Sequence, residues 1–153
     1  MSYRGAVTDQ PVILVSACLL GVECNHRGLA SPSAAVAALA ASARLIAVCP
    51  EVAGGLPTPR PAAEIQGDGR ICTAGGADVT DFYARGAAHA VALAQATGAT
   101  RAVLKARSPS CGCHQVYDGA FSRTLRDGEG VTASALRAAR VEVMSEEDLA
   151  ERH

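Results

Sequence analysis

Short apolar runs alternate with longer amphipathic segments along most of this chain. Four of the runs are rich in Val, Leu, Ile and Ala and end at polar, Gly or Pro residues. That pattern is typical of strands buried on both faces of a sheet. It predicts strands at residues 12–16, 44–48, 101–105 and 141–143. Two shorter runs, 63–65 and 70–73, flank the turn signal Asp68-Gly69 and predict a hairpin.

Helical patterns follow the strands. Ser31 is expected to cap the first helix, with Pro at its first position. Asp78 or Thr80 is expected to cap a long helix that ends at Gly98, a natural residue to follow a helix. The expected helices are residues 32–43, 80–97, 132–140 and a terminal helix that begins at Ser145 with a capping-box pattern.

Three further features complete this pattern. Phe82, Gly86, His89 and Leu93 share one face of the long helix, which is therefore expected to be buried. Segment 49–61 holds four prolines and two adjacent glycines, so it is predicted to be an ordered loop without helix. Segment 115–130 is polar and rich in Gly and Asp, and is expected to be loop with short strands.

The alternation of strands and helices predicts an α/β fold, a Rossmann-like sandwich with a mainly parallel sheet. The length of 153 residues and the 49% hydrophobic content fit a single domain, expected over 11–153 behind a loose N-terminal tail at 1–10. Ligands of such sheets bind beyond the carboxyl ends of the strands.

Three cysteines follow predicted strands at that edge: Cys18, Cys49 and Cys111. The N-terminus lacks the apolar core of a secretory signal, so we expect a cytoplasmic protein. Cysteines in such a protein more often serve metal binding or catalysis than disulfides. Convergent thiolates bind zinc, copper(I) or iron–sulfur clusters. By spacing alone, these cysteines are either metal ligands or small buried apolar residues.

The identity of the metal stays open at this point. A structural zinc site would close with a fourth ligand, from Cys24, Cys113 or His114. Three cysteines alone would instead leave one iron of a 4Fe–4S cubane open to a substrate. Since Cys24, Cys72 and Cys113 share no common position relative to the strands, we treat them as non-ligands.

Four polar residues near these cysteines are candidates for chemistry. Glu51 is a general acid/base, a solvated acid of its loop, or the ion-pair partner of Arg60. Ser108 and Ser110 either orient a substrate or satisfy the backbone of their loop. Lys105, at the end of a strand, either meets an anionic ligand or points to solvent.

Charge and hydropathy exclude some classes of function. The net charge is −1, so no strong positive field attracts nucleic acid. No apolar run approaches the ~20 residues of a membrane span. We expect neither a dedicated nucleic-acid-binding protein nor a membrane protein.

Several motifs in the same order resemble the thiouracil desulfurase family. The resemblance covers residues 12–146 and rests on VSACLLG at 15–21, CPE at 49–51, GGLPTPR at 54–60, GADVT at 76–80, SPSCG at 108–112, YDGAF at 117–121 and GVT at 130–132, together with Lys105. It implies a 4Fe–4S cluster held by Cys18, Cys49 and Cys111, with the fourth iron free of protein ligands.

The resemblance also implies a reaction. It is the non-redox removal of sulfur from a thiolated pyrimidine, such as 2- or 4-thiouracil or a thiouridine, to give uracil or uridine and sulfide. Glu51 and Ser108 match the family's proton-transfer pair, and we expect Lys105 and Ser110 to bind the substrate. Cys113 and His114 depart from the core motif, and we do not expect Cys113 to close the cluster as a fourth ligand.

Three alternatives stay open. In the first, the substrate is a thiouridine in tRNA, whereas the net charge of −1 favours a free nucleobase or nucleoside as partner. In the second, the protein is a zinc-stabilised α/β binding module and not an enzyme. In the third, it is a cysteine-based redox or sensor protein that binds no iron.

Overall fold

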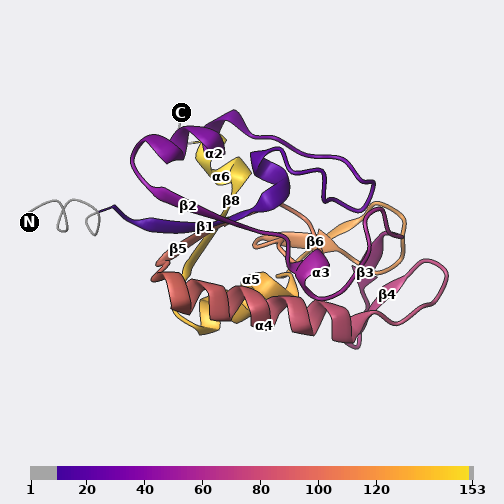
Figure 1. Ribbon diagram of the computed structural model, residues 1–153. Coiled ribbons are helices and arrows are strands. Elements are labelled where there is room, and N and C mark those ends of the chain that lie inside the picture. Colours follow the sequence, from indigo (N-terminus) through magenta and orange to yellow (C-terminus); the bar gives the residue numbers. More distant parts are fainter. Residues whose placement is uncertain (1–9, 152–153) are drawn as a thin grey trace, which may run out of the picture.

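Four parallel strands form the central sheet of the computed structural model, which describes residues 10–151 (Figure 1). The strand order is β2-β1-β5-β8, and every neighbouring pair is parallel. The bounds are β1 Val12–Ser16, β2 Arg44–Val48, β5 Arg101–Leu104 and β8 Glu142–Ser145. The α/β fold with a mainly parallel sheet is therefore confirmed. The N-terminal tail expected at 1–10 lies, except for residue 10, outside the described residues.

Helices cover both faces of this sheet (Figure 1). The short α2, Ala34–Ala38, and α6, Glu146–Glu151, lie on one face; α4, Thr80–Thr97, and α5, Val131–Ala138, lie on the other. Side chains alternate between the two faces along β1, so Ile13 and Val15 pack with the α2 and α6 side, and Leu14 with the α4 and α5 side. Burial on both faces explains the continuous apolar runs.

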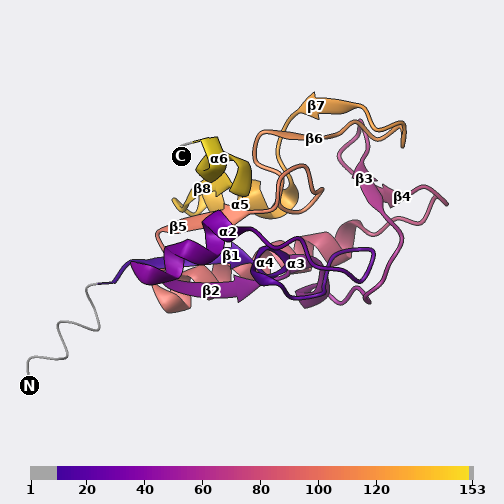
Figure 2. The ribbon, with the colours of Figure 1, turned by 90° about the horizontal axis from the view of Figure 1, so that it is seen from above.

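Two small hairpins stand beyond the carboxyl ends of the strands (Figure 2). One pairs β3, Ala63–Ile65, with β4, Ile71–Thr73; the other pairs β6, Gln115–Tyr117, with β7, Leu125–Asp127. The Glu64 carboxylate connects them, because its Oε1 accepts hydrogen bonds from the backbone N–H groups of Gly119 and Phe121 at 3.0 and 3.1 Å. The hairpins therefore border the edge of the sheet at which the cysteines follow the strands.

The ends of two helices agree with the sequence patterns. Gly98 follows α4 with a left-handed φ of 76°. Ser145 Oγ accepts hydrogen bonds from the backbone N–H groups of Glu147 and Asp148, and Asp148 accepts one from the Ser145 N–H in return. This is the reciprocal capping predicted for the last helix.

Four local predictions were wrong. The first helix begins later than expected, because the side chain of Ser33 and not Ser31 caps it, and it continues as a short 3₁₀ turn, Leu39–Ala41. Segment 49–61 does contain a helix, α3, Pro50–Ala53. Pro50 is compatible with it, because a helix's first residue needs no N–H partner.

The other two errors concern α4. Its N-cap residue is Val79 and no side chain caps it, because Asp78 accepts both of its hydrogen bonds from Thr80, the first residue of the helix. The buried face of α4 also differs from the prediction. The buried residues are Tyr83, Gly86, Ala87, Ala90 and Ala94, whereas His89 is exposed. The many alanines weaken the contrast between the two faces, which shifts the apparent apolar stripe by one position. Across residues 10–151, no helix combines the length and hydropathy needed to cross a bilayer.

Candidate active site

Three adjacent strands place Cys18, Cys49 and Cys111 at one edge of the sheet. Cys18 lies in the 3₁₀ turn Ala17–Leu20 directly after β1, and Cys49 lies between β2 and α3. Ser16 of β1 pairs with Val48 of β2, so the two cysteines leave the sheet at the same level. Cys111 lies in the loop that follows β5, the other neighbour of β1. The predicted convergence of the three residues is observed.

The thiols at this edge lie in an environment that disfavours their ionisation. Burial raises the pKa of Cys18 to about 11, with a further contribution from Cys49, while nearby Lys105 opposes the rise. Burial also raises the pKa of Cys111 to about 12, although Ser16 donates a hydrogen bond that favours its thiolate. Without metal these thiols are protonated at neutral pH, and a bound metal would displace their protons.

The spacing of the sulfur atoms distinguishes two kinds of metal site. A tetrahedral zinc ion with Zn–S bonds of about 2.3 Å requires sulfur atoms roughly 3.8 Å apart. Among the described residues, no three of the sulfur atoms of Cys18, Cys24, Cys49 and Cys111 lie within 4.8 Å of one another. In a polynuclear cluster each cysteine binds a different metal atom, so its ligand sulfurs are farther apart. The residues present therefore fit such a cluster better than a single ion.

Cys24 lies beside this site, although its sequence position led only to its mention as a possible fourth zinc ligand and otherwise to its treatment as a non-ligand. It is buried, and burial together with the Cys49 thiol raises its pKa to about 12. Its carbonyl oxygen accepts a hydrogen bond from the Cys49 thiol at 3.7 Å and another from Arg60 Nη2 at 2.9 Å. No local pattern indicates this, because the segment after β1 returns to the site through loops.

Glu51 and Arg60 form a buried ion pair at the start of α3. Arg60 Nε donates to Glu51 Oε1 at 2.7 Å, and the two side chains are 4% and 13% exposed. The same guanidinium donates to the Pro57 carbonyl and the Thr58 hydroxyl, so it holds the loop as well as the carboxylate. Burial alone lowers the pKa of Arg60, but the Glu51 carboxylate more than offsets this and raises it.

Tyr83 of α4 adds a second contact to the same carboxylate. Burial, and then the negative charge of Glu51, raise the pKa of the Tyr83 hydroxyl, which is hydrogen-bonded to Glu51. Glu51 thus has a cation and a hydroxyl as fixed partners, and its position does not depend on solvent. The sequence named Arg60 as an alternative partner but gave no signal for Tyr83.

Two glycines let α3 approach α4 so closely that their backbones touch. A Cβ added at Gly86 would lie 1.9 Å from the Pro50 carbonyl oxygen, and one at Gly54 would lie 1.9 Å from the Phe82 carbonyl oxygen. Neither obstacle is a side chain that can rotate away. This contact therefore sets the position of α3, and with it Cys49 and Glu51.

Ser108 organises the loop that carries Cys111. Its Oγ accepts hydrogen bonds from the backbone N–H groups of Ser110 and Cys111, both at 3.0 Å, and its carbonyl accepts one from Gly112 at 2.8 Å. Loop satisfaction, one of its two predicted roles, is observed. Its hydroxyl hydrogen is not used in these bonds, so it is available to a substrate.

The remaining two candidates have protein partners. Ser110 is 1% exposed, and its hydroxyl lies 2.8 Å from that of Thr132, which is fully buried at the start of α5. Lys105 Nζ lies 3.2 Å from Glu146 Oε2 and is close enough to Cys18 to affect its pKa. Ser110 therefore supports the loop from behind, whereas Lys105 lies near the cysteines.

Cys113 and His114 lie together with Asp148 of α6, where their ligand atoms form a separate group.

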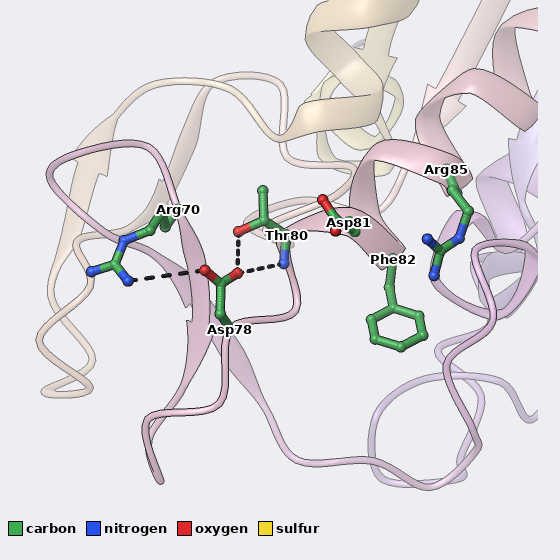
Figure 3. Close-up of a pocket in the computed structure, with 6 residues that line it drawn as sticks. All are labelled: Arg70, Asp78, Thr80, Asp81, Phe82 and Arg85. Atoms are coloured by element: carbon green, nitrogen blue, oxygen red, sulfur yellow. Dashed lines mark hydrogen bonds and ion pairs between the residues drawn. The ribbon is translucent and has the colours of Figure 1, made fainter.

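A depression of about 560 Å³ lies away from these cysteines, beside the start of α4 (Figure 3). Its lining includes Asp78, whose carboxylate accepts two hydrogen bonds from Thr80, and Arg85, stacked on Phe82 at 4.8 Å. It contains none of the predicted site residues and is not the candidate active site.

Comparisons with known proteins agree with this geometry. The family model described as 2-thiouracil desulfurase matches residues 13–148. A solved structure, described as a [4Fe-4S]-dependent thiouracil desulfidase TudS, superposes with a TM-score of 0.86 at 46% identity, covering 93% of this chain and 95% of that one. A Bacillus subtilis (strain 168) protein, the uncharacterized protein YbbK, is 41% identical over 147 residues, which is 90% of this chain and 97% of YbbK.

Proposed function

Because the chain belongs to the 2-thiouracil desulfurase family, we propose that it is an enzyme that removes sulfur from thiouracil. Its cofactor is a 4Fe–4S cluster, held by Cys18, Cys49 and Cys111. The observation that carries this proposal is the arrival of three thiols from three adjacent parallel strands at one edge of the sheet. The substrate is 2- or 4-thiouracil or the corresponding nucleoside.

The overall reaction exchanges one atom. The ring carbon loses its sulfur and gains the oxygen of a water molecule, and the two protons of that water leave with the sulfur as hydrogen sulfide. No electrons are transferred, so no redox partner is needed. The bound cluster supplies an iron atom without a protein ligand, a Lewis acid for the thiocarbonyl sulfur.

Glu51 is the proposed proton carrier. A carboxylate removes a proton from the attacking water and delivers it to the departing sulfur, a role worth roughly 10²–10⁴-fold in rate. Arg60 and Tyr83 hold this carboxylate in place, the first through the 2.7 Å bond to Oε1. Arg60 also donates to the Pro57 carbonyl and the Thr58 hydroxyl, so the cation that holds this carboxylate is itself held by the loop.

Ser108 is the proposed partner of Glu51. Its oxygen accepts two backbone N–H bonds, which leaves its O–H to donate to the substrate. Lys105 is proposed to attract the electron-rich edge of the thiolated ring, since its ammonium lies near Cys18. For Ser110, the buried bond to Thr132 favours a supporting role for the Cys111 loop over direct contact with substrate.

The state of the cysteines supports a reducing location. Three of the six cysteines must stay reduced to hold the proposed cluster, as is usual for thiols in the cytoplasm, and we place the enzyme there.

The test is made without oxygen. We would measure iron and acid-labile sulfide per chain and then follow the conversion of 2-thiouracil to uracil and sulfide by chromatography. About four iron and four sulfide per chain are expected, and Cys111→Ala should lose both the cluster and the activity. Cys72→Ser is the matched control, because Cys72 lies in β4 of the hairpin and should leave both unchanged.

Two further variants separate chemistry from assembly. Glu51→Gln should keep the iron and lower kcat by about 10²–10⁴-fold. Ser108→Asn keeps an acceptor for the two backbone N–H groups but lacks a hydroxyl, so it should also keep the iron and lose rate. A brown protein that acts only on thiolated tRNA would show that tRNA, and not the free base or nucleoside, is the substrate. A colourless protein that binds zinc at these cysteines would refute the proposal.

A further inference from the structure

A second group of potential metal ligands lies outside the three-cysteine site. It comprises Cys113, His114 and Asp148, whose Sγ, ring nitrogen and carboxylate oxygen all lie within 4.8 Å of one another. The first two residues follow the Cys111 loop, and Asp148 belongs to the first turn of α6. No other such group of three or more His, Cys, Asp and Glu side chains occurs within residues 10–151.

The distances in this group suit one particular class of ion. His114 Nε2 lies 2.8 and 3.1 Å from the two carboxylate oxygens of Asp148. Around a tetrahedral zinc ion, with bonds of about 2.0–2.3 Å, neighbouring ligand atoms lie roughly 3.3–3.8 Å apart. Small side-chain shifts therefore admit the ion. A thiolate, an imidazole and a carboxylate together suit zinc, whereas magnesium and calcium require mainly oxygen ligands.

The surroundings have two further properties of a metal site. Cys113 is 3% exposed, whereas the side chains of His114 and Asp148 are 58% and 27% exposed, so the group opens to solvent on one side. An ion can enter there, and a water molecule can complete its coordination. The backbone N–H of Ser145 donates to Asp148 Oδ2 at 2.8 Å, and a hydrogen bond of this kind orients a ligating carboxylate.

We propose that Cys113, His114 and Asp148, with one water molecule, bind a zinc ion that joins the segment after the Cys111 loop to α6. On binding, the Cys113 thiol gives up its proton to solvent and its sulfur bonds to the metal. The zinc site is independent of the proposed desulfurase activity. It fastens the loop that carries one cluster ligand to the helix that follows β8.

The test uses the full-length protein with its cluster reconstituted in the absence of oxygen. The protein is equilibrated with zinc chloride, freed of excess metal, and analysed for zinc and iron by mass spectrometry and zinc-edge X-ray absorption. We expect about one zinc per chain, with one sulfur and three nitrogen or oxygen neighbours. Cys113→Ser and His114→Asn should each weaken zinc binding at least about tenfold and leave the iron content unchanged.

The controls and the refuting outcomes use matched residues. Cys72→Ser and the exposed His89→Asn should retain the zinc. Because His114 is exposed, its substitution tests the site without endangering the fold. A zinc neighbour shell made mainly of sulfur would place the ion at the cluster cysteines and refute the proposal. Two other results would also refute it: a zinc content that His114→Asn leaves unchanged, or no retained zinc at all, in which case His114 and Asp148 are only a hydrogen-bonded pair.

Discussion

The contact between α3 and α4 makes Gly86→Ala an informative substitution, because two effects on stability oppose each other. Alanine is better than glycine in the interior of a helix by roughly 0.5–1 kcal/mol. The added methyl group, however, would lie 1.9 Å from the Pro50 carbonyl oxygen, so the helices must move apart. Overpacking of this kind typically costs about 1–3 kcal/mol, and a rigid backbone obstacle places it at the upper end. We therefore expect a net destabilisation of about 2 kcal/mol.

The measurement is thermal unfolding of the reduced, cluster-free protein, so that metal binding does not contribute. For a chain of this length, about 2 kcal/mol lowers the midpoint by roughly 4–8 °C. Gly67→Ala is the matched control: Gly67 lies in the turn between β3 and β4, and a Cβ there would meet nothing within 4 Å. Its free energy of unfolding should change by no more than about 0.5 kcal/mol, so its midpoint should stay close to that of the original protein.

A second measurement follows the consequence for the site. Since α3 begins directly after Cys49, a displaced α3 also displaces that proposed ligand and Glu51. Gly86→Ala protein should therefore take up less iron on reconstitution than Gly67→Ala protein. A Gly86→Ala variant as stable as the original, or more stable, would show that helix propensity outweighs the backbone contact, and the reasoning would fail.

Three further predictions concern buried or capped polar groups. Arg60→Met should destabilise the protein by about 3–5 kcal/mol, since it leaves Glu51 largely buried without its cation; urea unfolding measures this, and Arg60→Lys should recover part of the loss. Thr132→Val should cost about 0.5–1.5 kcal/mol in the same assay, because it removes one hydrogen-bond partner of the buried Ser110 hydroxyl. A hydroxyl and a backbone N–H at the start of α4 hold the pKa of Asp78 below its usual value. Its contribution to stability is therefore present above the unfolded pKa near 4 and is lost as the pH falls through the folded pKa, so Asp78→Asn should flatten the decline of the urea midpoint below pH 5.

The strands and the site at their ends were predictable because both depend on local signals. A short apolar run with a polar boundary identifies a buried strand wherever it occurs, and the parallel arrangement then brings the strand ends to one edge. Cys18, Cys49 and Cys111 could be grouped on this basis before any contact was known. Glu51 and Ser108 follow in the same segments, so their proximity to the cysteines was predictable too.

The features that escaped prediction depend on contacts between distant segments. Tyr83 meets Glu51 only because two glycines allow α4 and α3 to touch, and glycine spacing alone does not indicate a helix contact. Asp148 meets His114 because β8 lies beside β5, which requires the strand order. The helix at Pro50–Ala53 was missed for a local reason, since the count of prolines outweighed the position of the first one.

The placement of the three proposed ligand cysteines at the ends of different strands has a consequence for how the protein matures. Cys18 and Cys49 are synthesised early, whereas Cys111 leaves the ribosome only after most of the chain. Because β1 lies between β2 and β5, the three thiols meet only when both of its parallel pairings have formed, and such non-local pairings form slowly. A nascent chain that ends before Cys111 holds only two of the ligands. A cluster that uses all three cysteines can therefore form only after Cys111 has been synthesised and both strand pairings are in place, so the sheet itself determines when the protein becomes competent to receive its cluster.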